Sequence, residues 1–391
     1  MPIDLHRARA ETPGCDHVIH LNNAGAALMP AAVLHAVTAH LHREARLGGY
    51  EAAREAADQQ AAAYTCAARV LGCAPDEIAF TDSATRAFDT ALWALPLGAG
   101  DRIAVSRVCY GSNALALLEL KRRVGVRVVV LPSVPDGAVD LDALEAALRE
   151  GLAAVALTHI PTNSGLIQPA AEVGALARAH GVPYLLDACQ SFGQLQLDVE
   201  ALGCDVLTAT SRKYMRGPRG QGVLYVRRAL LERLHPPMPD LGSARWTDPD
   251  TFTWVDGARR LECWEHSVAS RLGFAAAMEV ALGFGLDAIE ARVLELGAQA
   301  RARLAAVDGV TVQDPGPRRC GIVTFTKRGV APAHLQAALA ERRIHTSVAD
   351  APGALLDMRA RGLDAVVRAS VHYYNTLDEL DQLAEAVAQI P

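Results

Sequence analysis

Two residues have the types and spacing needed for amine chemistry on a bound ring. Asp187 ends the apolar run YLLD at 184–187, and Lys213 follows the next run, DVLT at 205–208. If both runs are strands, the two side chains can face one crevice. A lysine amine can form a Schiff base there, and a carboxylate can keep a pyridinium nitrogen protonated, as pyridoxal phosphate chemistry requires. Taken singly, Asp187 could equally cap a helix and Lys213 could be a surface cation.

Short apolar runs that alternate with helical patterns supply the elements that must position these residues. This alternation predicts a mostly parallel sheet covered by helices on both faces. Ligands bind such sheets at the carboxyl ends of the strands, so we expect chemistry in the polar residues just after a strand. Strands are predicted at 102–106, 126–131, 154–158, 184–187, 205–208 and 222–226, and helices at 113–124, 141–150 and 170–180.

The pattern changes after about residue 235. Residues 235–256 hold four prolines and two tryptophans and are predicted to form a long loop. The segments beyond them predict a smaller α+β domain. They are a helical pattern at 270–304 that breaks near 283–285, strands at 322–325 and 366–371, and helices at 332–342 and 377–388.

The composition disfavours several classes of protein. Of 391 residues, 38 are basic and 44 acidic, so the formal net charge is −6, and 51% are apolar. Nucleic-acid binding needs clustered Lys and Arg, which this balance does not offer. No stretch has the length and apolar character of a membrane span, and the N-terminus lacks a signal-peptide core. We therefore expect a cytoplasmic protein with neither a nucleic-acid nor a membrane partner.

Eight cysteines are scattered through the chain and never form a C-x-x-C pair. In a cytoplasmic chain such thiols stay reduced and behave as small, partly buried residues. A zinc site would need paired soft ligands at short spacing, so no metal site is expected.

Several motifs, in a fixed order along nearly the whole chain, resemble one known family. They are HLNNAGAALMP at 20–30, YLLDACQSFGQ at 184–194, TSRKYMRGPRGQG at 210–222 and VRASVHYYNTLDEL at 367–380. The sequence resembles the class V aminotransferases, fold type I pyridoxal phosphate enzymes that include cysteine desulfurases, isopenicillin-epimerase-like proteins and C–S lyases. The resemblance implies an α/β fold with a seven-stranded, mostly parallel sheet. It also implies a large cofactor-binding domain at 20–262 and a small α+β domain formed by 1–19 and 263–391.

The resemblance implies a set of cofactor contacts by position. Lys213 corresponds to the Schiff-base lysine and Asp187 to the pyridinium partner, and these are the expected catalytic residues. Gln190 corresponds to the residue that hydrogen-bonds the phenolic oxygen, and Tyr110 to the aromatic ring stacked on the cofactor. The other expected cofactor contacts are the phosphate turn Ser83, Ala84 and Thr85, then Thr162 or Asn163, and Arg212.

The phosphate turn also has a physical reason, because backbone N–H groups at a helix N-terminus suit a phosphate. An ordinary helix cap at Ser83 is the alternative.

The resemblance also implies substrate contacts. Arg368 corresponds to the arginine that binds the α-carboxylate, where a planar guanidinium fits better than an ammonium group. Asn23 and Ala24 lie in the N-terminal loop that approaches the substrate. In the family, the region matching 246–264 reaches the neighbouring active site, so a homodimer with shared sites and a small amino-acid substrate is expected. Alternatively, the tryptophans of this region are only interface core.

Two departures from the family pattern narrow the activity. Cysteine desulfurases carry a nucleophilic Cys shortly before the arginine motif, whereas residues 344–370 contain none, which argues against a persulfide-forming desulfurase. The family often has Gly-Thr, with the Thr on the partner's phosphate, where this chain has Trp264-Glu265. A glutamate there would repel the phosphate unless a cation such as Arg212 intervenes.

The reaction is expected to start with removal of the α proton by Lys213. The carbanion then allows β-elimination, transamination or epimerisation. The motif RKYMRGPRG at 212–220 resembles the branch with isopenicillin-epimerase-like proteins and the ergothioneine-type C–S lyase. This favours β-elimination from an S-substituted cysteine or its sulfoxide, with a class V aminotransferase or an epimerase as alternatives. Arg368 argues against a non-catalytic protein that only binds the cofactor.

Overall fold

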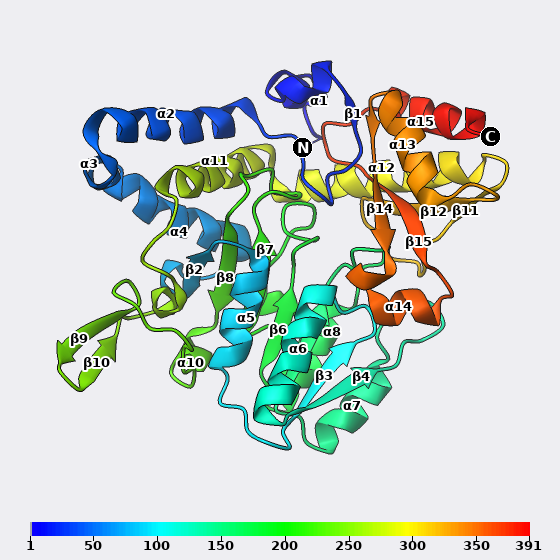
Figure 1. Cartoon of the computed structure of the whole chain (residues 1–391). Helices are drawn as coiled ribbons and strands as arrows, with labels where there is room; N and C mark the ends of the chain where they lie inside the picture. Colours follow the sequence, from blue (N-terminus) through cyan, green and yellow to red (C-terminus); the bar gives the residue numbers. More distant parts are fainter. Residues whose placement is uncertain (1) are drawn as a thin grey trace.

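The apolar runs form a central seven-stranded sheet in the computed structural model, which describes residues 2–391 (Figure 1). Its strands are β2 (Ile78–Thr81), β3 (Arg102–Ser106), β4 (Arg127–Leu131), β5 (Ala154–Thr158), β6 (Tyr184–Asp187), β7 (Val206–Thr210) and β8 (Gly222–Val226). Their order is β2-β8-β7-β6-β5-β3-β4. Only β8 runs against its neighbours, β2 and β7, and all other pairs are parallel. The predicted mostly parallel sheet is confirmed.

Alternate residues of each strand pack on opposite faces of this sheet, as the pleat requires. On one face, Ile103 and Leu185 pack in the cluster that includes α5 (Ala84–Ala94) and α6 (Gly111–Val124). On the other face, Ala104 and Leu186 belong to the cluster that includes α8 (Ala170–Ala179). Helices therefore cover both faces.

The helices predicted between the strands begin and end within two residues of the expected bounds. Asp140 caps α7 (Leu141–Arg149), because its carboxylate accepts a hydrogen bond of 3.0 Å from the Ala143 amide. Gly125 ends α6 with φ of 87°, a left-handed conformation that glycine adopts without strain. The short helices α9 (Val199–Leu202) and α10 (Arg228–Leu231) complete this part of the chain.

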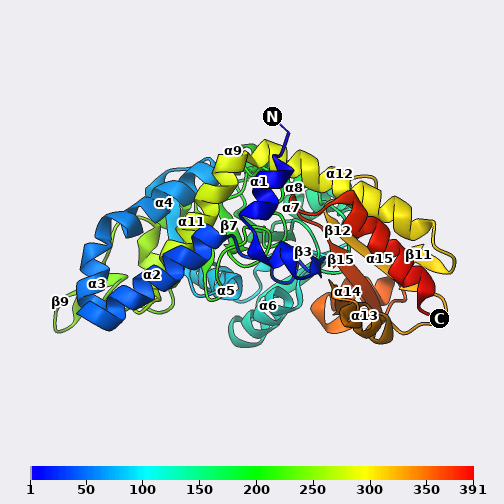
Figure 2. The ribbon, with the colours of Figure 1, turned by 90° about the horizontal axis from the view of Figure 1, so that it is seen from above.

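A second sheet has four antiparallel strands in the order β11-β12-β15-β14. They are β11 (Val310–Val312), β12 (Ile322–Lys327), β14 (Ser347–Asp350) and β15 (Ala365–Ser370). The associated helices are α12 (Leu286–Ala305), α13 (Pro332–Glu341), α14 (Leu355–Ala360) and α15 (Leu377–Gln389). Figure 2 shows α15 lying beside α12. The division of the chain into domains at residue 262 stays a prediction.

The N-terminal segment contacts both sheets, since its residues 57–71 pack against β2 and Asn22 forms a β-bridge with Ser370 of β15. Its helices are α1 (Leu5–Ala10), α2 (Ala31–Leu47), α3 (Gly49–Glu55) and α4 (Ala57–Leu71). The two-residue strand β1 (Ile19–His20) pairs in parallel with β13 (Ile344–His345) of the C-terminal part. Helix α11 (Val268–Phe284) packs against α2 and α4. Short 3₁₀ helices lie at Pro13–Asp16, Pro75–Glu77, Ala258–Leu261 and Ala351–Gly353.

The long helical pattern breaks where expected, at Gly285, between α11 and α12. Within residues 2–391, no single helix is long and apolar enough to cross a membrane. Helices α11 and α12 reach that length and hydropathy only together, and they are bent by 81° at the break.

Residues 235–256 differ from the prediction of a loop, because they contain the antiparallel hairpin β9 (Ala244–Asp248) and β10 (Thr251–Trp254). The prolines that suggested a loop lie outside both strands, and Pro249 lies in the turn between them. Figure 1 shows this hairpin projecting from the body at the lower left.

Candidate active site

The residues expected to bind the cofactor follow the carboxyl ends of five strands. Strands β2 and β7 run in the same direction because both are antiparallel to β8. The five strand ends therefore lie at one edge of the sheet, the usual ligand-binding edge. They are followed by Ser83 (β2), Tyr110 (β3), Thr162 (β5), Gln190 (β6) and Lys213 (β7).

Asp187 is the last residue of β6 and is only 4% exposed. Its Oδ2 accepts a hydrogen bond of 2.7 Å from Nδ2 of Asn113, and its Oδ1 accepts one of 3.0 Å from the Cys189 amide. These donors hold the carboxylate in one orientation. Sequence reasoning missed Asn113, whose only signal was a polar residue on the first turn of α6.

Lys213 lies three residues beyond β7, with its Nζ 6.0 Å from the centre of the Tyr110 ring. Burial lowers the pKa of Lys213, and the guanidinium groups of Arg212 and Arg368 lower it further, whereas the Asp187 carboxylate opposes this. A lowered pKa increases the fraction of free amine, which is the form that attacks a carbonyl. The structure thus brings the predicted lysine, its aromatic neighbour and Asp187 together.

Arg368 lies on β15 of the second sheet and is 7% exposed. Its Nε donates to Oγ of Ser347 at 3.1 Å, and its Nη1 donates to the carbonyl and hydroxyl oxygens of Thr162 at 2.9 and 2.7 Å. Among the described residues, Nη2 has no such partner. Burial lowers the pKa of Arg368 to about 10, so the group stays charged at neutral pH. It therefore offers a fixed cation with a free donor.

The structure distinguishes the two neighbours Thr162 and Asn163. Thr162 contacts Arg368, whereas Nδ2 of the fully buried Asn163 donates to Oδ2 of Asp357 at 2.8 Å. Asp357 belongs to α14 and also pairs with Arg361. Asn163 therefore links the strand-end loop to the second sheet, and its contact with the cofactor stays a prediction.

Gln190 is 3% exposed, and its Nε2 donates to the Ala24 carbonyl at 3.2 Å. Its Oε1 is buried and has no hydrogen-bond partner among residues 2–391. Buried polar atoms are rarely left unpaired, so this amide is suited to complete its bonds with a bound ligand.

The N-terminal loop is fixed against the end of β15. Asn23 is fully buried, donates to the Ser370 carbonyl at 2.7 Å and accepts from the Tyr374 hydroxyl. The Ala24 amide donates to Oγ of Ser370 at 2.9 Å. Both polar ends of Asn23 are thus engaged inside the protein, so its amide anchors this loop two residues from Arg368.

The predicted phosphate turn begins α5. Ser83 caps the helix by accepting from the Arg86 amide at 3.2 Å, and the next N–H groups lie in the first turn. Gly222 lies so close that an added Cβ would be 2.8 Å from the Ala84 nitrogen. Arg212 donates to the Gly25 carbonyl, and its own pKa is lowered by burial. The side chain of Glu265, which was expected to lie near a phosphate, is exposed to solvent in the single chain.

Comparison with known proteins decides the family. The sequence profile described as Aminotransferase class-V matches residues 19–383. The chain belongs to the class V aminotransferase family. Pyridoxal phosphate is therefore its cofactor. Lys213, Asp187 and the unpaired Oε1 of Gln190 fit that group at the sheet edge.

Relatives of this chain are named for more than one activity. This chain is 36% identical over 372 residues to a probable hercynylcysteine sulfoxide lyase of Mycobacterium tuberculosis. The match covers 94% of this chain and 89% of the relative. The chain is 29% identical over 386 residues to a probable cysteine desulfurase of Halalkalibacterium halodurans, covering 95% of this chain and 92% of the relative.

Solved structures share the fold. The apo cysteine desulfurase of Thermococcus onnurineus has a TM-score of 0.91 and 25% identity, with 100% of this chain and 98% of that chain covered. A cystine C–S lyase in complex with cysteine persulfide has a TM-score of 0.88 and 23% identity, with 97% and 99% covered. The fold type I architecture is thereby confirmed.

Proposed function

We propose that this class V enzyme is a C–S lyase that cleaves the Cβ–S bond of an S-substituted cysteine or cysteine sulfoxide by β-elimination. The chain is 36% identical to the probable sulfoxide lyase of Mycobacterium tuberculosis, compared with 29% for the probable desulfurase of Halalkalibacterium halodurans. The relatives named as desulfurases make that activity the main competitor.

The absence of a cysteine from residues 344–370, the interval expected to carry the nucleophile of a desulfurase, is the observation that carries the proposal. A desulfurase needs a thiolate that attacks the sulfur of cysteine. All eight cysteines of this chain have a raised pKa, mostly because of burial, and none lies in residues 344–370. The raised pKa of Cys189, which lies closest in sequence to Asp187, keeps it a thiol. A reaction that needs no protein thiolate fits this chain better.

The residues of the site account for the steps of such an elimination. When bound, pyridoxal phosphate supplies the electron sink for negative charge at the α carbon. Asp187 would face the pyridinium nitrogen, and Lys213 would be the linking amine. Arg368 binds the α-carboxylate, which fixes the α C–H bond relative to Nζ of Lys213. Lys213 takes the α proton, the Cβ–S bond breaks, and sulfur leaves with the electron pair. The three-carbon fragment then hydrolyses to pyruvate and ammonia.

The test uses the holoenzyme with no keto acid and a panel of S-substituted cysteines and their sulfoxides. Catalytic release of pyruvate and ammonia is expected, with none from Lys213→Ala, which lacks the base. When cysteine is the substrate, formation of alanine together with a protein persulfide, which an added thiol reduces to sulfide, would instead identify a desulfurase. Stoichiometric conversion of the cofactor to its amine form would identify an aminotransferase, and a change of substrate chirality an epimerase.

A further inference from the structure

Arg216 is a buried cation held by uncharged partners from three parts of the chain. It is 3% exposed. Its Nε donates to the Leu28 carbonyl at 2.9 Å, its Nη2 to Oγ1 of Thr12 at 2.5 Å, and its Nη1 to the Tyr373 hydroxyl. The guanidinium also lies 5.0 and 4.7 Å from the ring centres of Tyr373 and Tyr374. Cation–π contact and hydrogen bonds replace the water that such a buried charge loses.

The backbone of Arg216 is strained. Its φ of 61° lies in the left-handed region that residues other than glycine seldom adopt. The Arg216 amide donates to the Lys213 carbonyl at 2.9 Å, and the Gly217 amide donates to the Ser211 carbonyl at 2.8 Å. These bonds close a tight turn that carries Lys213. Such strain persists only where the surroundings fix it, and it concentrates at functional sites.

One side of this turn is attached to the N-terminal loop. The Ala27 amide donates to the Arg212 carbonyl at 2.9 Å, and Arg212 donates to the Gly25 carbonyl. Together with the bond from Arg216 to Leu28, these contacts hold residues 25–28 along the lysine turn. The loop that carries Asn23 and Ala24 is therefore fixed by Arg216 and Arg212.

The other side of the turn is attached to the segment that follows Arg368. The Nε2 atom of His372 lies 2.8 Å from the Tyr214 carbonyl, and its Nδ1 accepts from the Tyr373 amide at 2.9 Å. Nε2 must therefore carry the proton and donate it to Tyr214. Burial lowers the pKa of His372 far below its usual value, which keeps this neutral form. Arg216 adds a second attachment at Tyr373.

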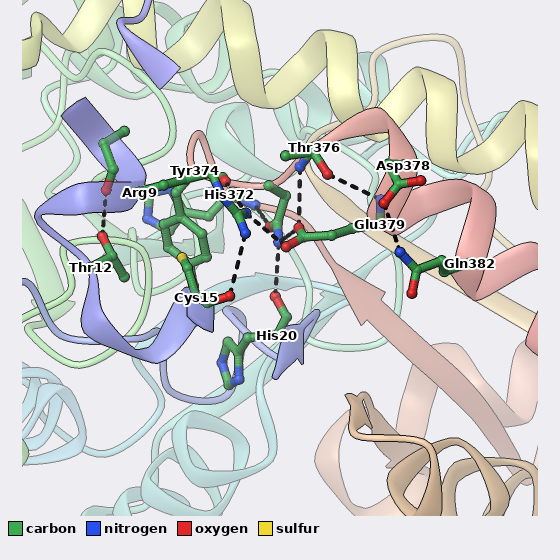
Figure 3. A network of polar contacts seen from close by, with 12 residues as sticks. Arg9, Thr12, Cys15, His20, His372, Tyr374, Thr376, Asp378, Glu379 and Gln382 are labelled. Atoms are coloured by element: carbon green, nitrogen blue, oxygen red, sulfur yellow. Dashed lines mark hydrogen bonds and ion pairs between the residues drawn. The ribbon is translucent and has the colours of Figure 1, made fainter. Parts of the chain in front are cut away.

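Figure 3 shows that the N-terminal segment and the segment after β15 are also joined directly to each other. Arg9 of α1 pairs with Glu379 of α15 at 2.7 Å and donates to the Tyr374 carbonyl at 3.1 Å. Asn375 donates both to the His20 carbonyl and to Glu379. Arg216 lies where this outer network meets the lysine turn, through its bonds to Thr12 and its stacking on Tyr374.

We propose that Arg216 is a positioning residue that fixes the amine of Lys213 relative to the carboxylate site at Arg368. This inference rests on the proposed roles of those two residues. Arg216 joins the lysine turn, the N-terminal loop and the segment after β15, so its loss removes a side chain that contacts all three and loosens their relative positions. Small misplacement of a reacting group costs large factors in rate.

The test compares Arg216→Gln and Arg216→Lys with a control variant, Arg233→Gln. Arg233 is an exposed arginine that lies just after α10. The first readout is amide hydrogen exchange of the holoprotein without substrate. In Arg216→Gln we expect exchange about tenfold faster in peptides covering 22–30, 211–217 and 371–376. The second readout is turnover, where kcat is expected to fall about a hundredfold with KM changed much less. Arg216→Lys should recover part of both effects, and Arg233→Gln should show neither.

The proposal is overturned if Arg216→Gln only lowers the melting temperature, with unchanged exchange in these peptides or an unchanged kcat. If this variant does not fold, Tyr373→Phe and Thr12→Val each remove one hydroxyl partner and must give smaller changes in the same direction. If the wild-type enzyme is inactive with every sulfur substrate, the proposed function is contradicted. The positioning role of Arg216 is still tested in that case, because the hydrogen-exchange measurement needs no substrate.

Discussion

The carboxylate site at Arg368 depends on how its guanidinium is held. Hydrogen bonds to Ser347 and Thr162 fix Nε and Nη1 of the planar guanidinium. Because the group is planar, these bonds also fix the direction in which Nη2 points. Arg368→Lys keeps the charge but loses this plane and the separate Nε and Nη donors. We expect kcat/KM for the amino-acid substrate to fall about 10- to 100-fold, since a charged hydrogen bond contributes about 1.5–3 kcal/mol. Steady-state kinetics check this, with Arg233→Lys as the control, and an unchanged kcat/KM would remove Arg368 from the site.

At the scale of residues, the sequence predicts some contacts and misses others for a clear reason. Asp187 ends a strand and Lys213 and Tyr110 follow strands, so their positions are set by local order along the chain. The partners that orient them come from far away: Asn113 is 74 residues from Asp187, and Ser347 comes from a different strand than Arg368. One sequence carries no signal for such pairs. For the same reason, the engagement of Asn163 and Asn23 inside the protein could not be expected.

At the scale of elements, short helix α14 is attached to the large sheet by one buried carboxylate. Asp357 is 2% exposed and pairs with Arg361 at 3.1 Å and Arg107 at 3.5 Å, and it accepts from Asn163 at 2.8 Å. Arg107 follows β3, and Asn163 follows β5. The carboxylate thus joins two strand-end loops to the sheet that carries Arg368.

Asp357→Ala should therefore weaken both stability and substrate binding. Removing one partner of a buried ion pair leaves the other charges unpaired, which costs about 3–5 kcal/mol. Urea unfolding checks the loss of stability, and a raised KM would show that the Thr162–Arg368 contact has moved. Asp308→Ala, which removes an exposed carboxylate, is the control and should have no measurable effect. Equal unfolding curves for the two variants would contradict this role of Asp357.

The elements themselves were mostly predictable, because apolar runs and helical periodicity are local properties. The strands from β3 to β8 and the break at Gly285 follow from such runs and from glycine. The hairpin β9–β10 was missed because its strands are short, largely exposed and flanked by prolines. Because neither strand has a buried face, their apolar residues show no alternating pattern. The turn-forming residues around them therefore favoured the prediction of a loop.

At the scale of the whole molecule, buried neutral histidines make stability depend on pH. Burial lowers the pKa of both His20 and His159 to about 4, from about 6.5 in an unfolded chain. Between these values the unfolded state binds more protons than the folded one, so stability falls as the pH falls from about 6.5 to 4. Each histidine accounts for up to about 3 kcal/mol of this loss. Urea unfolding at pH 7 and pH 5 should show it, and His159→Gln should show a smaller difference; an equal difference would contradict the assignment.

Several large apolar side chains are exposed near the hairpin β9–β10. Five of them form what we call the hairpin patch, each 48–74% exposed: Met238, Leu241, Trp246, Phe252 and Trp264. Trp246 and Phe252 are paired across the two strands, and Gly242 lies against Trp264. Single exposed apolar residues are ordinary, but a group of this kind marks an interaction surface.

We propose that a second copy of the chain covers the hairpin patch and completes the cofactor site. A cavity of about 400 Å³ lies between Met238 of the patch and the two residues that flank the phosphate turn, since Met238, Asp82 and Arg86 all line it. A partner seated on the patch would close this cavity beside α5. Trp246→Glu places a charge in that contact, so we expect a dimer for the wild type and a monomer with weaker cofactor binding for the variant.

Analytical ultracentrifugation at micromolar concentration measures the mass, and titration of the visible absorbance measures cofactor binding. Leu115→Glu is the control, because Leu115 is 68% exposed on α6 and lies outside the hairpin patch. A monomeric wild type, or a Trp246→Glu variant that keeps the mass of a dimer, would contradict the proposal. A monomeric variant with wild-type cofactor affinity would support the patch as a dimer interface but contradict its contribution to the cofactor site. The two measurements together decide whether the active site is built by one chain or by two.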